Sequence, residues 1–538
     1  MTPDPTALPD DTVARLRLDP DPGRGYHPSP VDWRDEVGYS ILLDRFAHAR
    51  FRLVAGDPAG GDTRHGGNLP GVTARLDYLR DLGVTVLQLS PVALTEPAAY
   101  HGYAPLHLTR VDPHLGTLDD LVELVDQAHR RGMRVLLDLV LNHTARVFDY
   151  PDGDDFKPDP APTVRWTRTV GPREFAAAER FTRRGNIRDW KHPEQAVRGD
   201  FPPGYRRLAS EDPETAELLT TVARWWVRVT DIDGIRVDAI RHMDPAFVAV
   251  FSARLKRYAD RLGKHNFLIL GEHSSSEDAS LAECLRSGVD TVYNYPEYRR
   301  QSWALHGRAP TTDLRRSFDL ARSALGERAH DRTVRFIDNH DVFRFLRDGE
   351  PEGRLHVAQA FLLFSTGMPM LYYGTEQGFR QPTGRLEREC SADRASPHNR
   401  EDMFGDGAFV SPSSAGDRFD TTSTCFRWTR RLVDVRRDHP ALRRGRQAHR
   451  FADPDGPGLY VFSRYTDTDE VLVVLNTDDR PRRHTVPAGP LLAAQPALVD
   501  ALDPGHRVDV GVAGVPVDVP GHGVRVLVAP DAAAVDVP

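Results

Sequence analysis

Carboxylates and histidines follow four apolar segments of the chain, where they could act together in acid–base or nucleophilic chemistry. These segments end in DLVLNH (138–143), GIRVDAIRH (234–242), LGEH (270–273) and FIDNHD (336–341). Three carboxylates and one arginine come from three different segment ends: Arg236, Asp238, Glu272 and Asp341. Buried carboxylates cost free energy unless they are paired or used. A salt-bridged rim would explain any one of these residues, but all of them together favour catalysis in one cavity.

This set of groups suits the cleavage of a glycosidic bond. One carboxylate attacks the anomeric carbon, while a second, kept protonated near neutral pH, donates a proton to the leaving oxygen. Arg236 lies two residues before Asp238, so both side chains share one face of a strand and the cation can hold Asp238 ionised. Glu272 follows an apolar strand, where partial desolvation suits an acid role. In a retaining enzyme the two carboxyl groups should lie roughly 5–5.5 Å apart.

The elements that must position these groups are short apolar runs that alternate with amphipathic helical patterns. We predict strands at 38–43, 84–89, 134–139, 234–237, 267–270, 291–293, 334–337 and 370–373. The runs are apolar on both faces, as in parallel strands covered by helices. Helical patterns lie between them, such as 118–132, which ends on Gly132, and 214–229. Eight repeats predict an α/β fold, the (β/α)8 TIM barrel, with reactive groups at the carboxyl ends of the strands. A doubly wound sheet competes, but no glycine fingerprint follows the first strand.

Departures from this rhythm predict the domain organisation. Residues 1–30 form an N-terminal extension rich in Pro and Asp, and 31–143 with 215–447 form the barrel. Residues 144–214, after the third strand, are too long for a simple loop, so we expect an inserted subdomain over the mouth of the barrel. Strands without helices over 448–538 predict a C-terminal antiparallel β-sandwich. A second irregular stretch, 380–422, follows the eighth strand.

Composition limits the partners and the compartment. A net charge of −8 over 538 residues predicts solubility and no nucleic-acid partner. Three widely spaced cysteines, Cys284, Cys390 and Cys425, predict neither a disulfide framework nor a zinc site and are typical of a reducing compartment. No apolar run approaches a membrane span and the polar first residues do not form a signal peptide. We therefore expect a cytoplasmic protein that does not bind membranes.

The four motifs, in this order and on these strands, resemble the signature regions of the α-amylase family of glycoside hydrolases. Further similarities lie at LDYLRDLGVTVLQLSP (76–91), YHGY (100–103) and GMPMLYYGTEQG (367–378), and the inserted subdomain and terminal β-domain match in position. The resemblance implies a retaining α-glycosidase that acts on malto-oligosaccharides or α-glucans through a covalent glycosyl-enzyme intermediate.

The resemblance also implies a role for each residue. Asp238 is the nucleophile, Glu272 the general acid/base, and Asp341 orients substrate hydroxyls. The other implied substrate-binding residues are an aromatic that stacks on the sugar, an arginine beneath the nucleophile, a basic pair beyond the cleavage point and two histidines at the cleaved sugar: Tyr103, Arg236, Arg241 with His242, His143 and His340. Asp138 is implied as a structural partner of this network.

Two positions depart from the family pattern. Members acting on α-1,4-glucans commonly carry Lys-His where this chain has Arg241-His242, and Lys and Arg are not equivalent hydrogen-bonding groups. Many members bind calcium through the equivalent of Asn142 and an aspartate, whose place is taken here by Arg207. Ca²⁺ requires several oxygen ligands, so we expect Arg207 to fill that place electrostatically. This interpretation requires no cofactor, and whether the protein binds a metal ion stays open.

Alternatives remain within and beyond this chemistry. A transglycosylase or isomerase of α-glucosides shares the covalent intermediate and differs only in whether water or a sugar hydroxyl enters next. A non-catalytic sugar-binding or scaffold relative should have lost some carboxylates, whereas Asp238, Glu272 and Asp341 are all present. The sequence leaves the linkage, endo or exo action, and oligomeric state open.

Overall fold

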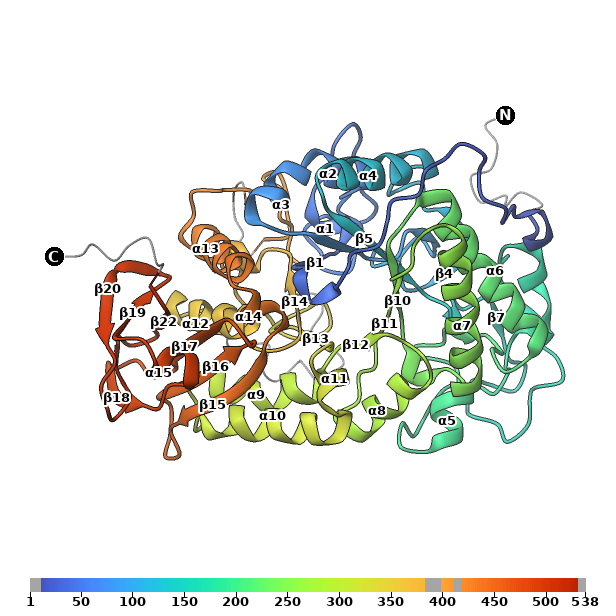
Figure 1. Cartoon of the computed structure of the whole chain (residues 1–538). Coiled ribbons are helices and arrows are strands. Elements are labelled where there is room, and N and C mark those ends of the chain that lie inside the picture. Colours follow the sequence, from blue (N-terminus) through green and yellow to red (C-terminus); the bar gives the residue numbers. More distant parts are fainter. Residues whose placement is uncertain (1–10, 383–397, 411–415, 417, 531–538) are drawn as a thin grey trace.

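Eight parallel strands form a closed barrel at the centre of the molecule (Figure 1). The computed structural model describes residues 11–382, 398–410, 416 and 418–530. The barrel strands are β1 Gly38–Ile41, β2 Val86–Leu89, β5 Arg134–Leu139, β10 Gly234–Val237, β11 Leu268–Gly271, β12 Thr291–Val292, β13 Val334–Arg335 and β14 Met368–Tyr372. Each pairs with its neighbour in chain order, β14 pairs with β1, and a parallel bridge from Tyr293 to Val334 joins β12 to β13. The predicted TIM barrel is confirmed.

The barrel strands are apolar on both faces because each face meets a different core. In β5, Val135 and Leu137 pack in the outer core beneath the helices, whereas Leu136 belongs to the inner core of the barrel. Four strands are shorter than predicted: β1 ends at Ile41, β2 begins at Val86, β12 ends at Val292 and β13 ends at Arg335. Beyond β13 the chain leaves the sheet, and the Asp338 carboxylate accepts the N–H of Phe345.

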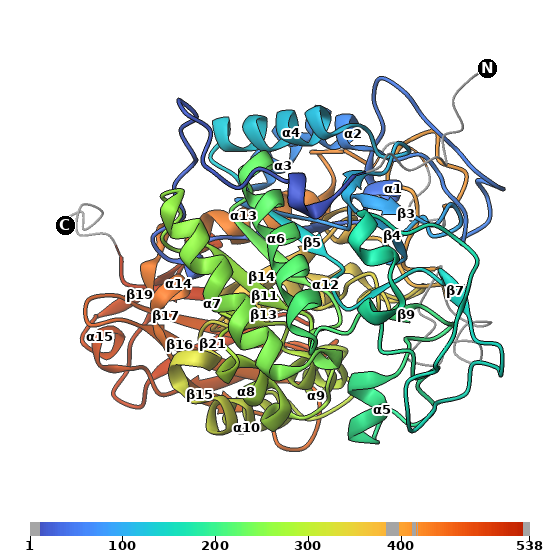
Figure 2. The ribbon, with the colours of Figure 1, turned by 90° about the vertical axis from the view of Figure 1, so that its right-hand side faces the viewer.

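Helices follow the strands and surround the barrel (Figures 1 and 2). They are α1 Leu43–Phe46, α2 Leu69–Ala74, α3 Leu76–Leu82, α4 Leu118–Arg130, α6 Pro213–Thr230, α7 Pro245–Arg261, α8 Asp278–Arg286, α9 Tyr295–Leu305, α10 Thr312–Leu325, α11 Glu327–His330, α12 Glu352–Phe364, α13 Thr424–Asp438 and α14 Pro440–Arg444. The Thr117 side chain caps α4, and Gly132, with φ of 76°, stops it as predicted. None of the described helices is both long and apolar enough to cross a membrane.

The segment between β5 and α6 forms the inserted subdomain. Its short strands pair as β6 His143–Thr144 with β9 Arg206–Arg207, and β7 Phe148–Asp149 with β8 Arg165–Trp166. Helix α5 spans Pro193–Arg198, and a further hairpin after β2 pairs β3 Ala93–Thr95 with β4 Pro105–Val111. Because β6 directly follows β5, the subdomain stands at the carboxyl end of the barrel strands. In Figure 1, β7 and α5 lie on the opposite side of the barrel from the C-terminal sheet.

The C-terminal part is a β-sandwich, as predicted. A six-stranded antiparallel sheet contains β15 Arg446–Ala452, β16 Leu459–Tyr465, β17 Glu470–Asn476, β22 Val524–Val528, β19 Ala497–Asp500 and β20 Asp503–Asp509. A second sheet pairs β18 Arg482–Val486 with β21 Val515–Val519, and the short helix α15 spans Pro490–Ala493. Val461 and Leu472 of the large sheet share one core with Val486 and Val517 of the small one. The first strand begins at Arg446, slightly before the predicted boundary at 448.

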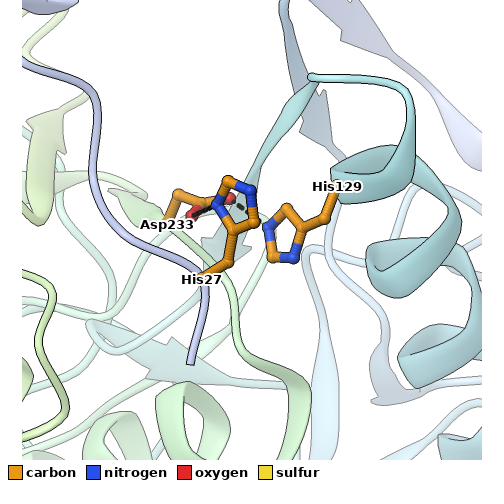
Figure 3. Close-up of side chains that lie close together, drawn as sticks. All are labelled: His27, His129 and Asp233. Atoms are coloured by element: carbon orange, nitrogen blue, oxygen red, sulfur yellow. Dashed lines mark hydrogen bonds and ion pairs between the residues drawn. The ribbon is translucent and has the colours of Figure 1, made fainter. Parts of the chain in front are cut away.

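The N-terminal extension begins against the inserted subdomain, where Val13 N–H donates to the Glu174 carboxylate, and reaches the amino-terminal end of the barrel strands at His27. The His27 ring stacks on the His129 ring at 4.0 Å (Figure 3). Lys264 Nζ donates to the backbone carbonyl oxygen of His27 at 2.9 Å. His129 Nε2 in turn hydrogen-bonds Asp233, directly before β10. Residues 1–10 of this extension, 383–397 of the predicted irregular stretch with Cys390, 411–415 and 417 within it, and the last residues 531–538 lie outside the described part.

Candidate active site

Arg236 lies at the centre of a cluster of three carboxylates at the carboxyl end of the barrel. Its Nη1 donates to Asp138 Oδ2 at 2.6 Å and to Asp238 Oδ1 at 2.8 Å, and its Nη2 lies 3.9 Å from Glu272 Oε2. The same-face placement of Arg236 and Asp238 is therefore as expected. A fully buried cation among these acids compensates part of their desolvation and fixes the orientation of Asp238.

Glu272 follows β11 and occupies a shielded position, with 11% of its side chain exposed. Its Oε2 accepts the backbone N–H of Ala239 at 3.0 Å. Ala239 has φ of 50°, a left-handed conformation that costs free energy for a residue with a Cβ and turns this N–H toward Glu272. Burial raises the pKa of Glu272 to about 7, assisted by the charges of Asp238 and Asp341 and opposed by Arg236. Glu272 can thus hold a proton near neutral pH, as a general acid must.

This pKa predicts the alkaline side of the pH–rate profile. We expect kcat/KM to fall as the pH rises through about 7, because Glu272 then loses the proton that the leaving oxygen needs. The measurement is kcat/KM for maltotriose over a series of buffers. A profile that stays flat to high pH, or that falls near the ordinary glutamate value of ~4.3, would contradict the assignment.

Asp341 follows β13 and faces the same centre from the other side, with 44% of its side chain exposed. His340 Nε2 lies 3.0 Å from its Oδ2, and Arg400 Nη2 lies 3.5 Å from its Oδ1. Burial raises the pKa of Asp341, but the His340 side chain and the Arg400 guanidinium outweigh it and hold this pKa well below its usual range. An ionised carboxylate at the mouth can accept hydrogen bonds from sugar hydroxyls.

Arg400 is a site residue that the sequence reasoning missed. It is buried, donates to the His340 carbonyl oxygen at 3.0 Å and to the Tyr100 hydroxyl at 3.0 Å, and reaches Asp341. It lies in the run NRED (399–402), all four residues of which are buried. A buried run of polar residues has no apolar pattern, so only its position after the eighth strand could have drawn attention to it.

Tyr103 and His143 line the same centre. The Tyr103 hydroxyl donates to Asp138 Oδ2 at 2.9 Å, and its ring is nearly parallel to that of His340 at 5.3 Å. His143 Nε2 lies 2.9 Å from the Tyr103 carbonyl oxygen, and burial lowers the pKa of His143, so its ring is neutral at neutral pH. Tyr103 is partly exposed, which leaves part of its ring free for a sugar.

His242 and Arg241 meet the inserted subdomain. His242 Nδ1 lies 2.8 Å from the carbonyl oxygen of Ala196 in α5, and burial lowers the pKa of His242 to about 4. A neutral, buried imidazole at this place connects barrel and subdomain. Arg241 is partly exposed and makes no ion pair with any residue that the structure describes, so its guanidinium is available to a ligand.

Arg207, which the family resemblance sets at the position of a calcium ligand, is fully buried at the junction of barrel and subdomain. The buried guanidinium donates to the carbonyl oxygens of His242 at 3.2 Å and Leu208 at 2.6 Å, and to Glu211 at 3.1 Å. The backbone carbonyl oxygen of Asn142 accepts a hydrogen bond from Leu208 N–H, and the side-chain Oδ1 of Asn142 is buried without a hydrogen-bond partner among the described residues. A fixed positive charge that already uses the carbonyl oxygens does not fit a Ca²⁺ ion, which needs several free oxygen ligands.

Contacts thus link eight of the predicted residues into one cluster: Tyr103, Asp138, His143, Arg236, Asp238, Glu272, His340 and Asp341. Asn142, Arg207 and His242 lie at the junction to the subdomain. Asp238 and Glu272 contact the same guanidinium and are equally shielded, each with 11% of its side chain exposed, and burial raises the pKa of Glu272 to about 7. Two neighbouring carboxylates, of which Glu272 can carry a proton near neutral pH, can perform nucleophilic attack and acid catalysis on an acetal carbon. The predicted separation of the two carboxyl groups stays a prediction.

Comparison with known proteins agrees with this geometry. Residues 41–434 match the family model described as "Alpha amylase, catalytic domain". The chain is 30% identical over 494 residues to an alpha-amylase of Streptomyces lividans, covering 80% of this chain and 53% of that protein. It is 26% identical to a cyclomaltodextrin glucanotransferase of Klebsiella oxytoca, covering 83% and 71%. The solved alpha-amylase of Geobacillus thermoleovorans in complex with acarbose superposes with a TM-score of 0.75 at 26% identity, covering 93% and 99%. The chain thus spans about half the length of the Streptomyces relative.

Proposed function

The chain belongs to the alpha-amylase family, and on that basis we propose that it cleaves α-glucosidic bonds of malto-oligosaccharides or α-glucans with retention of configuration. In this mechanism Asp238 attacks the anomeric carbon while Glu272 protonates the leaving oxygen. Glu272 then deprotonates the water that hydrolyses the glycosyl-enzyme. Asp341, held ionised by His340 and Arg400, orients the sugar hydroxyls.

The observation that carries this proposal is the shared guanidinium of Arg236 between Asp138, Asp238 and Glu272, combined with the raised pKa of Glu272. A merely structural cluster would gain from having every carboxylate paired and ionised. Here burial raises the pKa of both Asp138 and Glu272 to about 7. The Asp138 side chain is fully buried, whereas Glu272 keeps 11% of its side chain exposed and can pass a proton to a leaving oxygen, which is the acid role that glycoside cleavage needs.

Turnover of a small substrate panel tests the proposal. Maltotriose, soluble starch, isomaltose, trehalose and sucrose are incubated with the full chain, and all products are separated by chromatography. We expect cleavage of the α-1,4-linked substrates, since His242 is retained at the junction with the subdomain. If the protein cleaved none of the five substrates, the proposal would be contradicted.

Transfer of the glucosyl group to a sugar acceptor is the second candidate function. The similarity to a cyclomaltodextrin glucanotransferase supports it. Both reactions share the intermediate and differ in the group that attacks it. Adding glucose or maltose as an acceptor separates them: a transferase forms longer or rearranged oligosaccharides at the expense of hydrolysis, whereas a hydrolase keeps releasing only shorter products.

We further propose that no Ca²⁺ is needed at the junction of barrel and subdomain, because Arg207 supplies the positive charge there. After exhaustive chelation and dialysis, added Ca²⁺ should leave both activity and melting temperature unchanged. Arg207→Met should destabilise the chain by about 1–3 kcal/mol, since it removes the guanidinium donor from the His242 carbonyl oxygen and one of the two donors from the Leu208 carbonyl oxygen, which keeps Ser210 N–H. Arg207→Lys, which keeps the charge, should lose less. A melting temperature that rises on addition of Ca²⁺ would contradict this proposal.

A cytoplasmic location is proposed as well. It is supported by the two cysteines in the described residues, Cys284 and Cys425, which are both unpaired. Fractionation of the source cells tests it: activity in the culture medium rather than in the cell extract would contradict it.

A further inference from the structure

Three metal-binding side chains meet where α12 packs against α13, outside the candidate active site. Glu352 and His356 lie four residues apart in α12 and therefore on one face of that helix. Cys425 lies in the first turn of α13. One ligand atom from each of the three residues lies within 4.8 Å of the other two. The cysteine spacing alone gave no sign of this, because the other two donors come from a distant helix.

The donors of this group are not consumed by other partners. His356 Nε2 is buried and has no hydrogen-bond partner among the residues that the structure describes. The thiol of Cys425 is 3% exposed and hydrogen-bonds the Glu352 carboxylate. Arg380 Nη2 touches Glu352 only at 4.0 Å.

Gly378 packs closely beside the thiol. A Cβ on Gly378 would lie 3.2 Å from Cys425 Sγ, tighter than an ordinary contact, and 4.0 Å from Glu352 Oε1, so a side chain at this position would crowd the thiol. Gly378 has φ of 72°, a conformation that favours glycine in any case. The exposed position of Glu352 leaves a path for the ion from solvent.

The other group of metal-binding residues, His27, His129 and Asp233, differs in this respect (Figure 3). Arg134 Nη1 lies 2.9 Å from His27 Nδ1, and His129 Nε2 is bonded to Asp233 Oδ2. Lys264 Nζ lies 3.2 Å from Asp233 Oδ1. Two cations and a closed hydrogen-bond network already occupy these donors, so this group is a structural clasp for the N-terminal extension.

We propose that Glu352, His356 and Cys425 form a binding site for Zn²⁺ or a similar divalent transition metal. One oxygen, one nitrogen and one sulfur ligand, with water as the fourth, match the preferences of Zn²⁺. Mg²⁺ and Ca²⁺ prefer oxygen ligands, so this set does not bind them tightly. Binding needs the three atoms to draw together to metal–ligand distances of ~2.0–2.3 Å. The thiol loses its proton to solvent as the Zn–S bond forms, and no electron is transferred.

The ion would join α12 to α13 and act on stability. None of the three ligands touches Arg236 or the carboxylates around it, so the inference is independent of the proposed function. Metal binding to the folded chain alone stabilises it in proportion to the logarithm of metal concentration over Kd.

Cobalt(II) provides a direct test because a thiolate ligand gives it a charge-transfer absorption band in the near ultraviolet. The full chain is stripped with a chelator, dialysed and titrated with Co²⁺, and the titration is repeated with Zn²⁺ while the melting temperature is followed. We expect the band in the wild type and in the Cys284→Ser and Cys390→Ser controls, and a higher melting temperature with Zn²⁺.

Two variants at the site decide the outcome. Cys425→Ser should lose the band, and His356→Ala, at a partly exposed position that tolerates truncation, should weaken Co²⁺ binding at least about 100-fold, beyond what loss of an outer-shell partner costs. No band in the wild type at saturating Co²⁺, a band that survives in Cys425→Ser, or unchanged affinity in His356→Ala would each overturn the proposal.

Discussion

Asp238→Asn is expected to lower kcat on maltotriose by roughly 10⁴-fold or more, the scale seen when a group that acts in a covalent step is removed. The amide is nearly the same size as the carboxylate, and its oxygen can still accept from Arg236 Nη1. It is a far weaker nucleophile, so the glycosyl-enzyme cannot form. The measurement is steady-state turnover with product chromatography.

Two controls separate chemistry from folding in this experiment. Asp119→Asn removes a carboxylate from the exposed first turn of α4 and should leave kcat unchanged. The melting temperature of Asp238→Asn should stay close to that of the wild type. A correctly folded Asp238→Asn variant that keeps substantial activity would refute the role of Asp238.

Glu272→Gln is expected to lower kcat/KM by about 10²–10⁴-fold on maltotriose, whose leaving group needs a proton. Glutamine can still accept the Ala239 N–H through its carbonyl oxygen, so the local geometry survives. α-Glucosyl fluoride carries a leaving group that departs with little protonation, so its loss should be much smaller. The ratio of the two losses measures the acid role directly.

The alkaline limb of the pH profile should also disappear in Glu272→Gln, because the titrating group has been removed. The matched control is Glu283→Gln, which neutralises an exposed carboxylate on α8, the helix after β11, and should change neither value. Equal losses on maltotriose and on α-glucosyl fluoride would contradict general acid catalysis by Glu272.

The barrel was predictable because its strands carry a strong local signal. Runs such as VLLDL in β5 are buried on both faces, and this burial leaves only apolar residues at most positions. The ends of β12 and β13 were placed too late, since Tyr293 and Phe336 are apolar residues of the inner core that lie just outside the paired segments. In the C-terminal domain, only β16, β17 and β22 carry apolar runs strong enough to predict, and β15, β18, β19, β20 and β21 escaped prediction. Of these, β18 is mostly exposed and β20 contains Pro504 and Gly505.

Among the site residues, too, some are predictable from the sequence and others are not. Arg236, Asp238 and Glu272 are predictable since each sits on or directly after a strand whose direction is known. Arg400 reaches Asp341 from a segment with no periodic pattern, so only tertiary packing brings them together. That Arg207 takes the expected calcium position stays a prediction from its identity, whereas its donation to the His242 carbonyl oxygen depends on how the subdomain folds back on the barrel.

The most direct test of the central claim is the anomeric configuration of the first product, followed by proton NMR during the early turnover of maltotriose, before mutarotation. A double displacement through Asp238 inverts the anomeric carbon twice, so the newly released reducing end should appear as the α anomer. The signal of the β anomer should grow only later, at the rate of spontaneous mutarotation. First appearance of the β anomer would show a single displacement by water and contradict a covalent intermediate on Asp238.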